Sequence, residues 1–167
     1  MKTQRFANAG TDQVVRQGSL VTLNGAASND PDNAPWPLTF AWAQTVGTGA
    51  NVSLTGATTA TPKFTPGVKG IYTYSLVVND GRDSSPTASV KITVPTLGDI
   101  DLDGDVDKND LVKIRAARYN PANGSNDLRD INGDGKITTL DVRLAKRLCT
   151  RRECANERGE KDNEKDD

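Results

Sequence analysis

Histidine is absent from the 167 residues, and the chain has two cysteines and only 5% aromatic residues. Without imidazole groups there is no histidine base for a catalytic triad and no histidine ligand for zinc. The net charge of −1 gives no basic surface of the kind that binds nucleic acid. No apolar run is long enough to span a membrane or to serve as a leader peptide in the first ten residues, so an exported chain would be part of a larger protein. The composition argues against an enzyme.

Charged residues are distributed unevenly. Residues 7–95 hold five basic and five acidic side chains, whereas the shorter stretch 97–154 holds eleven of each sign. Residues 155–167 are almost wholly charged, so we expect them to be disordered. The change in composition around residues 94–98 predicts a domain boundary. Its linker reaches at most roughly 14 Å, so we expect contact between the two domains.

Apolar and polar residues alternate in the first domain, which predicts half-buried strands at residues 20–25, 38–44, 71–80 and 89–94. Turn-forming clusters separate them, and no helical pattern intervenes. This arrangement is typical of an antiparallel β-sandwich. The side chains expected to face inward are Val21, Leu23, Leu38, Phe40, Trp42, Tyr72, Tyr74, Leu76, Val78, Val90, Ile92 and Val94.

The blocks ANAGTDQVV, VTLNGAASNDPD, LTFAWAQT, ATPKFTP and GIYTYSLVVNDG occur in this order over residues 7–94. Together they resemble the polycystic kidney disease (PKD) repeat. The resemblance implies an immunoglobulin-like sandwich of the kind common in secreted bacterial enzymes and adhesins, with a spacer or adhesive role. Trp42 is expected in the core, and Trp36, between two prolines, is a candidate for surface contact.

Three aspartates in turns of this domain leave two interpretations open. Asp30, Asp32 and Asp80 form either an additional calcium site at one end of the sandwich or turns in which each carboxylate bonds its own backbone.

Two segments, residues 99–110 (DIDLDGDVDKND) and 130–141 (DINGDGKITTLD), repeat one pattern 31 residues apart. Each has oxygen-bearing residues at positions 1, 3, 5, 9 and 12, glycine at position 6 and an aliphatic residue at position 8. An EF-hand loop supplies the oxygen ligands of calcium at this spacing, including the backbone carbonyl of position 7. The pattern predicts two Ca²⁺ ions, held by Asp99, Asp101, Asp103, Asp105, Asp107 and Asp110 and by Asp130, Asn132, Asp134, Lys136, Thr138 and Asp141.

Short helices are predicted over residues 110–119 and 140–148. Position 9 of each loop is a natural N-cap, and position 12 falls where the acid of a capping box sits. The start of each helix therefore aims the closing aspartate back at the ion. The position-8 residues, Val106 and Ile137, are expected to pair the two loops through a short β contact.

No helix is expected before the second loop, because residues 120–129 are rich in turn formers. Each repeat is thus a loop followed by a helix. With this order, the opening Leu97-Gly98-Asp99 and the 31-residue spacing, residues 97–154 resemble a type I dockerin. The resemblance implies a small α module with paired EF-hand-like repeats that folds on binding two Ca²⁺ ions. It also implies docking onto a cohesin-like module, in extracellular polysaccharide-degrading complexes or at cell surfaces.

The expected contact positions depart from those of cellulosomal dockerins. These often carry a Ser-Thr pair before the closing aspartate, where this chain has Lys108-Asn109 and Thr139-Leu140. A two-fold-symmetric binding mode is therefore not expected, and the module resembles a dockerin from outside the cellulosome systems. The basic helix faces are either solvated or suited to an acidic partner. The candidate partner-binding residues are Lys108, Asn109, Arg115, Arg118, Thr139, Leu140, Arg143 and Arg147.

Cys149 and Cys154 end the second helix. Two thiols alone make a poor zinc site, and a secreted context favours a disulfide over free thiols. The sequence as a whole predicts a non-catalytic, calcium-dependent docking fragment of a larger secreted protein, located outside the cell or at its surface. Two alternatives stay open: a calcium-stabilised structural or adhesion module without a cohesin partner, and a carbohydrate-binding sandwich.

Overall fold

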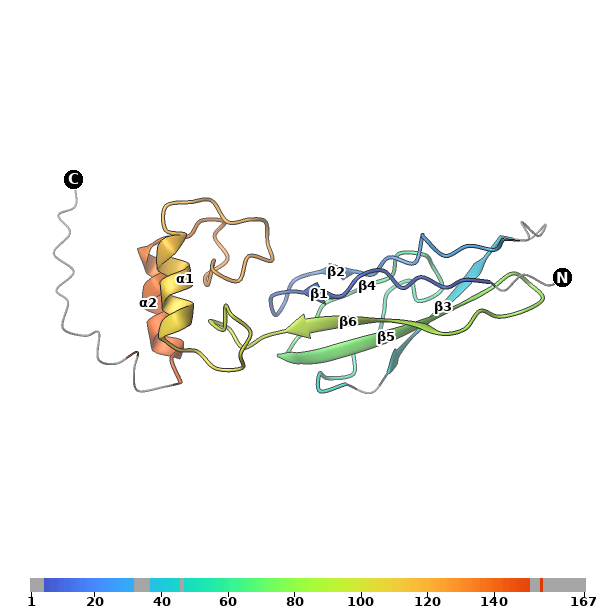
Figure 1. Cartoon of the computed structure of the whole chain (residues 1–167), viewed down its shortest axis with the longest axis horizontal. Coiled ribbons are helices and arrows are strands. Elements are labelled where there is room, and N and C mark those ends of the chain that lie inside the picture. Colours follow the sequence, from blue (N-terminus) through green and yellow to red (C-terminus); the bar gives the residue numbers. More distant parts are fainter. Residues whose placement is uncertain (1–4, 32–36, 46, 151–153, 155–167) are drawn as a thin grey trace. The chain divides into compact units, whose positions relative to one another are not determined.

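The chain divides into two compact units, Met1–Val94 and Pro95–Asp167 (Figure 1). The computed structural model describes residues 5–31, 37–45, 47–150 and 154. The predictions for Asp32, Trp36 and residues 155–167 lie outside the described residues. Within these ranges no helix has the length and apolar character that crossing a bilayer requires.

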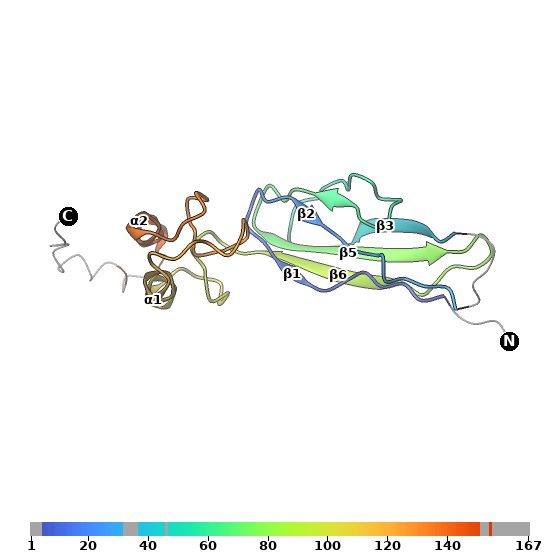
Figure 2. The same ribbon diagram turned by 90° about the horizontal axis from the view of Figure 1, so that it is seen from above.

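The first unit is an all-β sandwich, as the alternating pattern predicts. One sheet has the strand order β1-β6-β5-β3, and the other pairs β2 with β4 (Figure 2). β1 runs parallel to β6, whereas the other neighbouring strands are antiparallel. The strands are β1 (Gln13–Val14), β2 (Val21–Thr22), β3 (Thr39–Thr45), β4 (Lys63–Phe64), β5 (Gly70–Asn79) and β6 (Ala88–Val94).

The long strand β5 forms the centre of the sandwich core. Its alternate residues Tyr72, Tyr74, Leu76 and Val78 are fully buried, which confirms the predicted face. Phe64 of the opposite sheet packs its ring 4.8 Å from that of Tyr74, measured between ring centres. Aromatic contacts of this kind hold the two sheets together.

Trp42 lies in the core with 6% of its surface exposed, as expected. The predicted strand at 20–25 is shortened to β2, although Gly25 still donates its N–H to the Ala60 carbonyl. Gly25 passes so close to the core that an added Cβ would lie 3.0 Å from both Trp42 and Leu76. A side chain at this position would require Trp42 and Leu76 to shift by a few tenths of an ångström.

A buried ion pair closes one end of the sandwich. The side chain of Asp80 is fully buried, accepts the N–H groups of Arg82 and Asp83, and pairs with the Arg5 guanidinium. Arg5 is 7% exposed, and its Nε lies 4.0 Å from Asp30. Arginine thus supplies the positive charge between these carboxylates. The backbone hydrogen bonds of Asp80 match the second interpretation of the sequence, in which a turn carboxylate bonds its own backbone.

The second unit contains two helices, α1 (Lys108–Ala116) and α2 (Thr139–Leu148), which lie side by side in both views (Figures 1 and 2). α1 starts two residues earlier than predicted and ends three earlier. After the helix, Ala117 and Arg118 donate to the carbonyls three residues before them, and Tyr119 adopts a left-handed φ of 67°. Its ring is 73% exposed. The buried core of this unit consists of Leu111, Ile114, Ala117, Ile131, Ile137, Val142, Ala145 and Cys154.

The expected β contact between Val106 and Ile137 is wrong. Ile137 exchanges backbone hydrogen bonds with Tyr119 and Asn120, which follow α1, and the Val106 carbonyl accepts the N–H of Thr150, which follows α2. Each loop therefore pairs with the segment after the other loop's helix. The side-by-side packing of the helices brings these segments to the loops.

Acid should weaken the sandwich through Asp80. The N–H of Asp83, followed by that of Arg82 and the Arg5 side chain, lowers the pKa of Asp80 to about 2 from the usual 3.8. This stabilisation is fully present above about pH 4 and is lost as the pH falls through about 2, because the unfolded chain binds the proton more readily. We expect Asp80→Asn to lower the melting temperature at neutral pH and to flatten its fall between pH 4 and 2. Melting temperatures are measured by tryptophan fluorescence. If they fall equally steeply with pH in the variant and in the unchanged protein, this prediction is contradicted.

Candidate metal centre

In the first loop, the closing Asp110 side chain is fully buried and ties both ends of the loop together. Its Oδ1 accepts the N–H groups of Ile100 and Asp101, at 2.6 and 3.1 Å. Its Oδ2 accepts the N–H of Asp107 at 2.8 Å. One carboxylate thus joins the start of the loop to the start of α1.

The second loop repeats these contacts 31 residues later. Asp141 is also fully buried, and its Oδ1 accepts the N–H groups of Ile131 and Asn132 at 2.8 and 3.3 Å. Its Oδ2 accepts the N–H of Thr138 at 2.7 Å. The sequence repeat is therefore also a repeat of geometry.

Position 1 of each loop is a buried aspartate. Asp99 is 3% exposed, and its Oδ2 accepts the Gly104 N–H, while its Oδ1 is buried without a hydrogen-bond partner. Burial, and then the nearby carboxylates of Asp110 and Asp103, raise the pKa of Asp99. In the second loop, Asp130 accepts the N–H groups of Gly133 and Gly135.

The first loop gathers carboxylate oxygens closely. Those of Asp99, Asp101 and Asp103 lie within 4.8 Å of one another, as do those of Asp103, Asp105 and Asp107. The Oδ1 of Asp101 is buried without a hydrogen-bond partner, and its Oδ2 lies 3.6 Å from Lys113 Nζ. An all-oxygen donor set suits a hard divalent cation such as Ca²⁺ rather than zinc.

The second loop replaces one of these charges with an amide. Asn132 donates its Nδ2–H to Asp134 at 2.8 Å, and this bond is the main cause that lowers the pKa of Asp134. Lys136, at position 7, is exposed and donates its N–H to Asp134. Fewer carboxylates surround this loop, so it carries less negative charge.

The capping boxes predicted at both helices are confirmed. Asp107 accepts the N–H of Asn109 and Thr138 accepts that of Leu140, while Asp110 and Asp141 reach back to the cap residues. Position 6 has a left-handed φ in both loops, which only glycine adopts freely. The first loop places Leu102 at φ 65° where the second has a glycine.

The candidate partner-binding residues are spread along the two helices. On α2, Leu140 is 48% exposed, and Arg143 and Arg147 are exposed beside it. Thr139 is half-buried. On α1, the residues Lys108 and Asn109 are exposed. Arg115 and Arg118, of which Arg118 follows the helix, are half-buried.

A disulfide joins Cys149 to Cys154 just after α2. Between these cysteines, Thr150 bonds to Val106 of the first loop through its backbone and its hydroxyl. Thr150 was not among the residues predicted from the sequence to belong to the site. The 31-residue repeat could have indicated its contact with the first loop, because it aligns Thr150 with Tyr119, which contacts the second loop.

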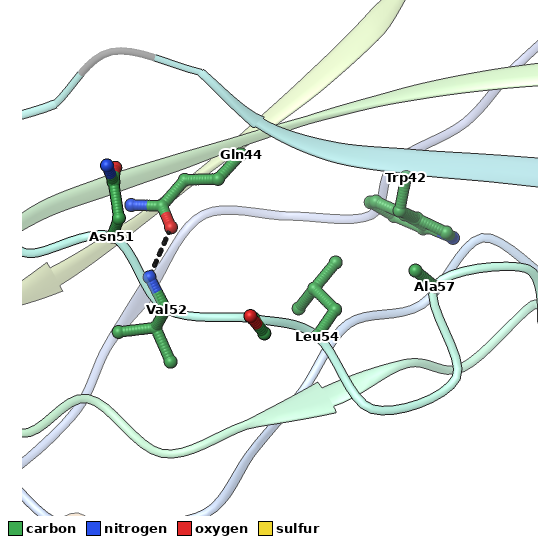
Figure 3. Close-up of a pocket in the computed structure, with 7 residues that line it drawn as sticks. Trp42, Gln44, Asn51, Val52, Leu54 and Ala57 are labelled. Carbon is green, nitrogen blue, oxygen red and sulfur yellow. Dashed lines mark hydrogen bonds between the residues drawn. The ribbon is translucent and has the colours of Figure 1, made fainter.

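A surface groove of about 510 Å³ lies on the sandwich beside β3, lined by Trp42, Gln44 and the segment after β3 (Figure 3). Its main polar groups are engaged by the chain itself. The Gln44 amide binds the Ala50 carbonyl and the Val52 N–H, and the indole N–H donates to the Thr59 carbonyl. These bonds hold the segment after β3 against the sandwich.

Residues 9–94 match the family model described as K319L-like, PKD domain. Two proteins named ulvan lyase, long isoform, are similar to the chain. The one from Glaciecola sp. (strain KUL10) is 28% identical over 52% of this chain and 8% of its own length. The one from Pseudoalteromonas sp. (strain PLSV) is 32% identical over 53% of this chain and 9% of its own length. The chain thus spans less than a tenth of the length of these relatives.

Two solved structures are also similar to the chain. One is a nucleoside hydrolase-related hypothetical protein from Saccharophagus degradans, described as associated with carbohydrate metabolism. Its TM-score is 0.49 at 17% identity, covering 56% of this chain and 26% of that one. The other is the PKD domain from the KIAA 1837 protein, with a TM-score of 0.44 at 28% identity, covering 53% of this chain and 83% of that one.

Gly98, directly before the first ligand position, is expected to be intolerant of a side chain. Its φ is 96°, and an added Cβ would lie 3.2 Å from Val106 and 3.4 Å from Leu148. Gly124 has a φ of 76° but open space around it. Gly124→Ala should cost about 1 kcal/mol of unfolding free energy, and Gly98→Ala more, because crowding adds to the backbone strain. Urea unfolding in the presence of calcium measures the unfolding free energy of both variants. An equal loss of free energy in the two would contradict the effect of crowding at Gly98.

Proposed function

Because the chain belongs, through residues 9–94, to the K319L-like PKD domain family, we propose that its sandwich is a non-catalytic spacer for a calcium-dependent docking module. PKD-like domains are typically non-catalytic. The module is the dockerin-like segment 97–154, and its partner is a cohesin-like module.

The observation that carries this proposal is the repeated geometry of the two acidic loops. Both closing aspartates are buried in the same hydrogen-bond arrangement, and the buried Oδ1 of Asp99 has no hydrogen-bond partner among the described residues. A buried carboxylate oxygen without a partner is costly. A bound Ca²⁺ removes this cost and also relieves the repulsion among neighbouring carboxylates.

Twelve residues would hold the two ions. The side chains at positions 1, 3, 5 and 12 supply most of the oxygens, position 7 supplies its backbone carbonyl, and position 9 binds directly or through water. The ligands are Asp99, Asp101, Asp103, Asp105, Asp107 and Asp110 for one ion, and Asp130, Asn132, Asp134, Lys136, Thr138 and Asp141 for the other. The calcium ions stabilise the fold and supply no catalysis.

The exposed face of α2 supports a docking role. Leu140 offers an apolar contact, and Arg143 and Arg147 follow it on the same side of the helix at a spacing of three and four residues. A partner surface with acidic residues around an apolar centre would complement this face. α1 carries Lys108, Asn109 and Arg115, and Arg118 follows it, so the two helices are not equivalent.

The setting we propose is extracellular, within a larger protein that takes part in polysaccharide degradation or attachment to a cell surface. The relatives named ulvan lyase support this setting. A disulfide at the end of the module suits an oxidising environment.

A second candidate function keeps the calcium but removes the partner: the module then stabilises or caps a larger assembly. The buried closing aspartates favour this role as much as docking, since they concern folding alone. Binding to a cohesin-like module separates the two functions.

Calcium should fold the module and bind at two sites. We expect chelator to lower helicity by circular dichroism and calorimetry to give two ions per chain. Asp110→Asn and Asp141→Asn keep an oxygen for the N–H groups but lose the closing charge, so each should remove one ion. Asp12→Asn in the sandwich is the control and should keep both. Unchanged helicity with chelator, or two ions in either loop variant, would contradict the assignment.

Docking should depend on the basic face of α2. In biolayer interferometry against cohesin modules from the source genome, Arg143→Glu with Arg147→Glu should weaken binding at least tenfold, because the new charges repel an acidic partner. The control reverses two sandwich charges, with Lys63→Glu and Lys91→Glu. Calcium removal should abolish binding. If no cohesin binds the unchanged protein, the structural alternative holds instead.

A further inference from the structure

Both backbone polar groups of Val106 are held by one residue from the far end of the module. The Val106 N–H donates to the Thr150 hydroxyl oxygen at 3.1 Å, and the Val106 carbonyl accepts the Thr150 N–H at 3.0 Å. The same hydroxyl lies 3.3 Å from that carbonyl and donates to it. Val106 is fully buried at position 8, between the position-7 and position-9 ligands of the first loop.

The Val106 N–H belongs to the same planar peptide unit as the Asp105 carbonyl. The chain has no cis peptide bond among its described residues, so this N–H and this carbonyl point in opposite directions. Holding the N–H on one side fixes the direction of the carbonyl on the other. The Asp105 carbonyl is the position-7 ligand of an EF-hand-like loop.

The second loop achieves the same orientation with backbone alone. The Ile137 N–H donates to the Asn120 carbonyl at 3.0 Å, and the Ile137 carbonyl accepts the Tyr119 N–H at 2.8 Å. Tyr119 is the equivalent of Thr150 in the 31-residue repeat. The support of position 8 thus differs between the loops: a side-chain hydroxyl binds the position-8 N–H in the first loop, and a backbone carbonyl does so in the second.

A covalent link holds Thr150 in place. Cys149, its neighbour, is bonded to Cys154, which is buried in the core of the module. The sulfur of Cys154 lies 3.9 Å from the Val106 carbonyl oxygen. The disulfide therefore ties the neighbour of Thr150 to the buried core of the module, beside Val106.

We propose that Thr150, held by the Cys149–Cys154 disulfide, is a positioning residue that sets the calcium affinity of the first loop without affecting the second. The inference rests on the proposed calcium binding. It assigns a role in metal binding to residues that contact the loop and not the ion.

Site-resolved NMR of the full chain, titrated with Ca²⁺ alone, tests this. The amides of Gly104 and Gly135 donate to the position-1 aspartates, so each reports its own loop. Thr150→Val removes the hydroxyl and should raise the calcium midpoint of Gly104 about fivefold, the effect of one ordinary hydrogen bond. The Gly135 midpoint should not move. Thr150→Ser keeps the hydroxyl and should restore the original Gly104 midpoint.

The disulfide is tested in the same way with Cys149→Ser and Cys154→Ser together, which should shift the Gly104 midpoint in the same direction and leave Gly135 in place. An unchanged Gly104 midpoint in Thr150→Val, or equal shifts of both glycines, would overturn the role of Thr150, since a general loss of stability moves both loops. If neither glycine responds to calcium in the unchanged protein, the calcium proposal itself fails, and this inference fails with it.

Discussion

A fully buried carboxylate at the start of each helix holds the second unit together. Asp110 and Asp141 each accept three backbone N–H groups, two from the beginning of a loop and one from the N-cap of the helix. A helix begins with N–H groups that lack partners inside the helix, and its dipole favours a negative charge there. The same side chain therefore closes the loop, starts the helix and places its charge beside the other carboxylates.

This arrangement concentrates negative charge in a small, buried space. In the sandwich, the comparable problem at Asp80 is solved from within the chain, because Arg5 supplies the positive charge and two backbone N–H groups complete the hydrogen bonds. In the first loop, the buried Oδ1 of Asp99 has no hydrogen-bond partner among the described residues. The contrast between these two buried aspartates is the physical basis for proposing a bound cation at the first loop.

The repeat is regular in its loops and irregular around them. Hydrogen bonds to the closing aspartates match residue by residue, yet the first loop has Leu102 where the second has a glycine, and a hydroxyl where the second uses backbone. Duplicated loops that differ in charge and in support are expected to differ in affinity, since calcium affinity depends on ligand charge and on the rigidity of the site.

The sequence by itself determined what depends on spacing along a short stretch. The faces of β5 and β6, the glycine turns of the loops and the N-caps all follow from residues within a dozen positions of one another. Only the tertiary structure decided the contacts between distant segments: the pairing of Arg5 with Asp80, the bonds of Thr150 to Val106, and the burial of Val142 and Ala145 rather than Leu140 on α2. Local patterns are encoded by the period of a strand, loop or helix. Contacts between residues 44 or 75 positions apart depend instead on the tertiary fold, which a local sequence pattern does not specify.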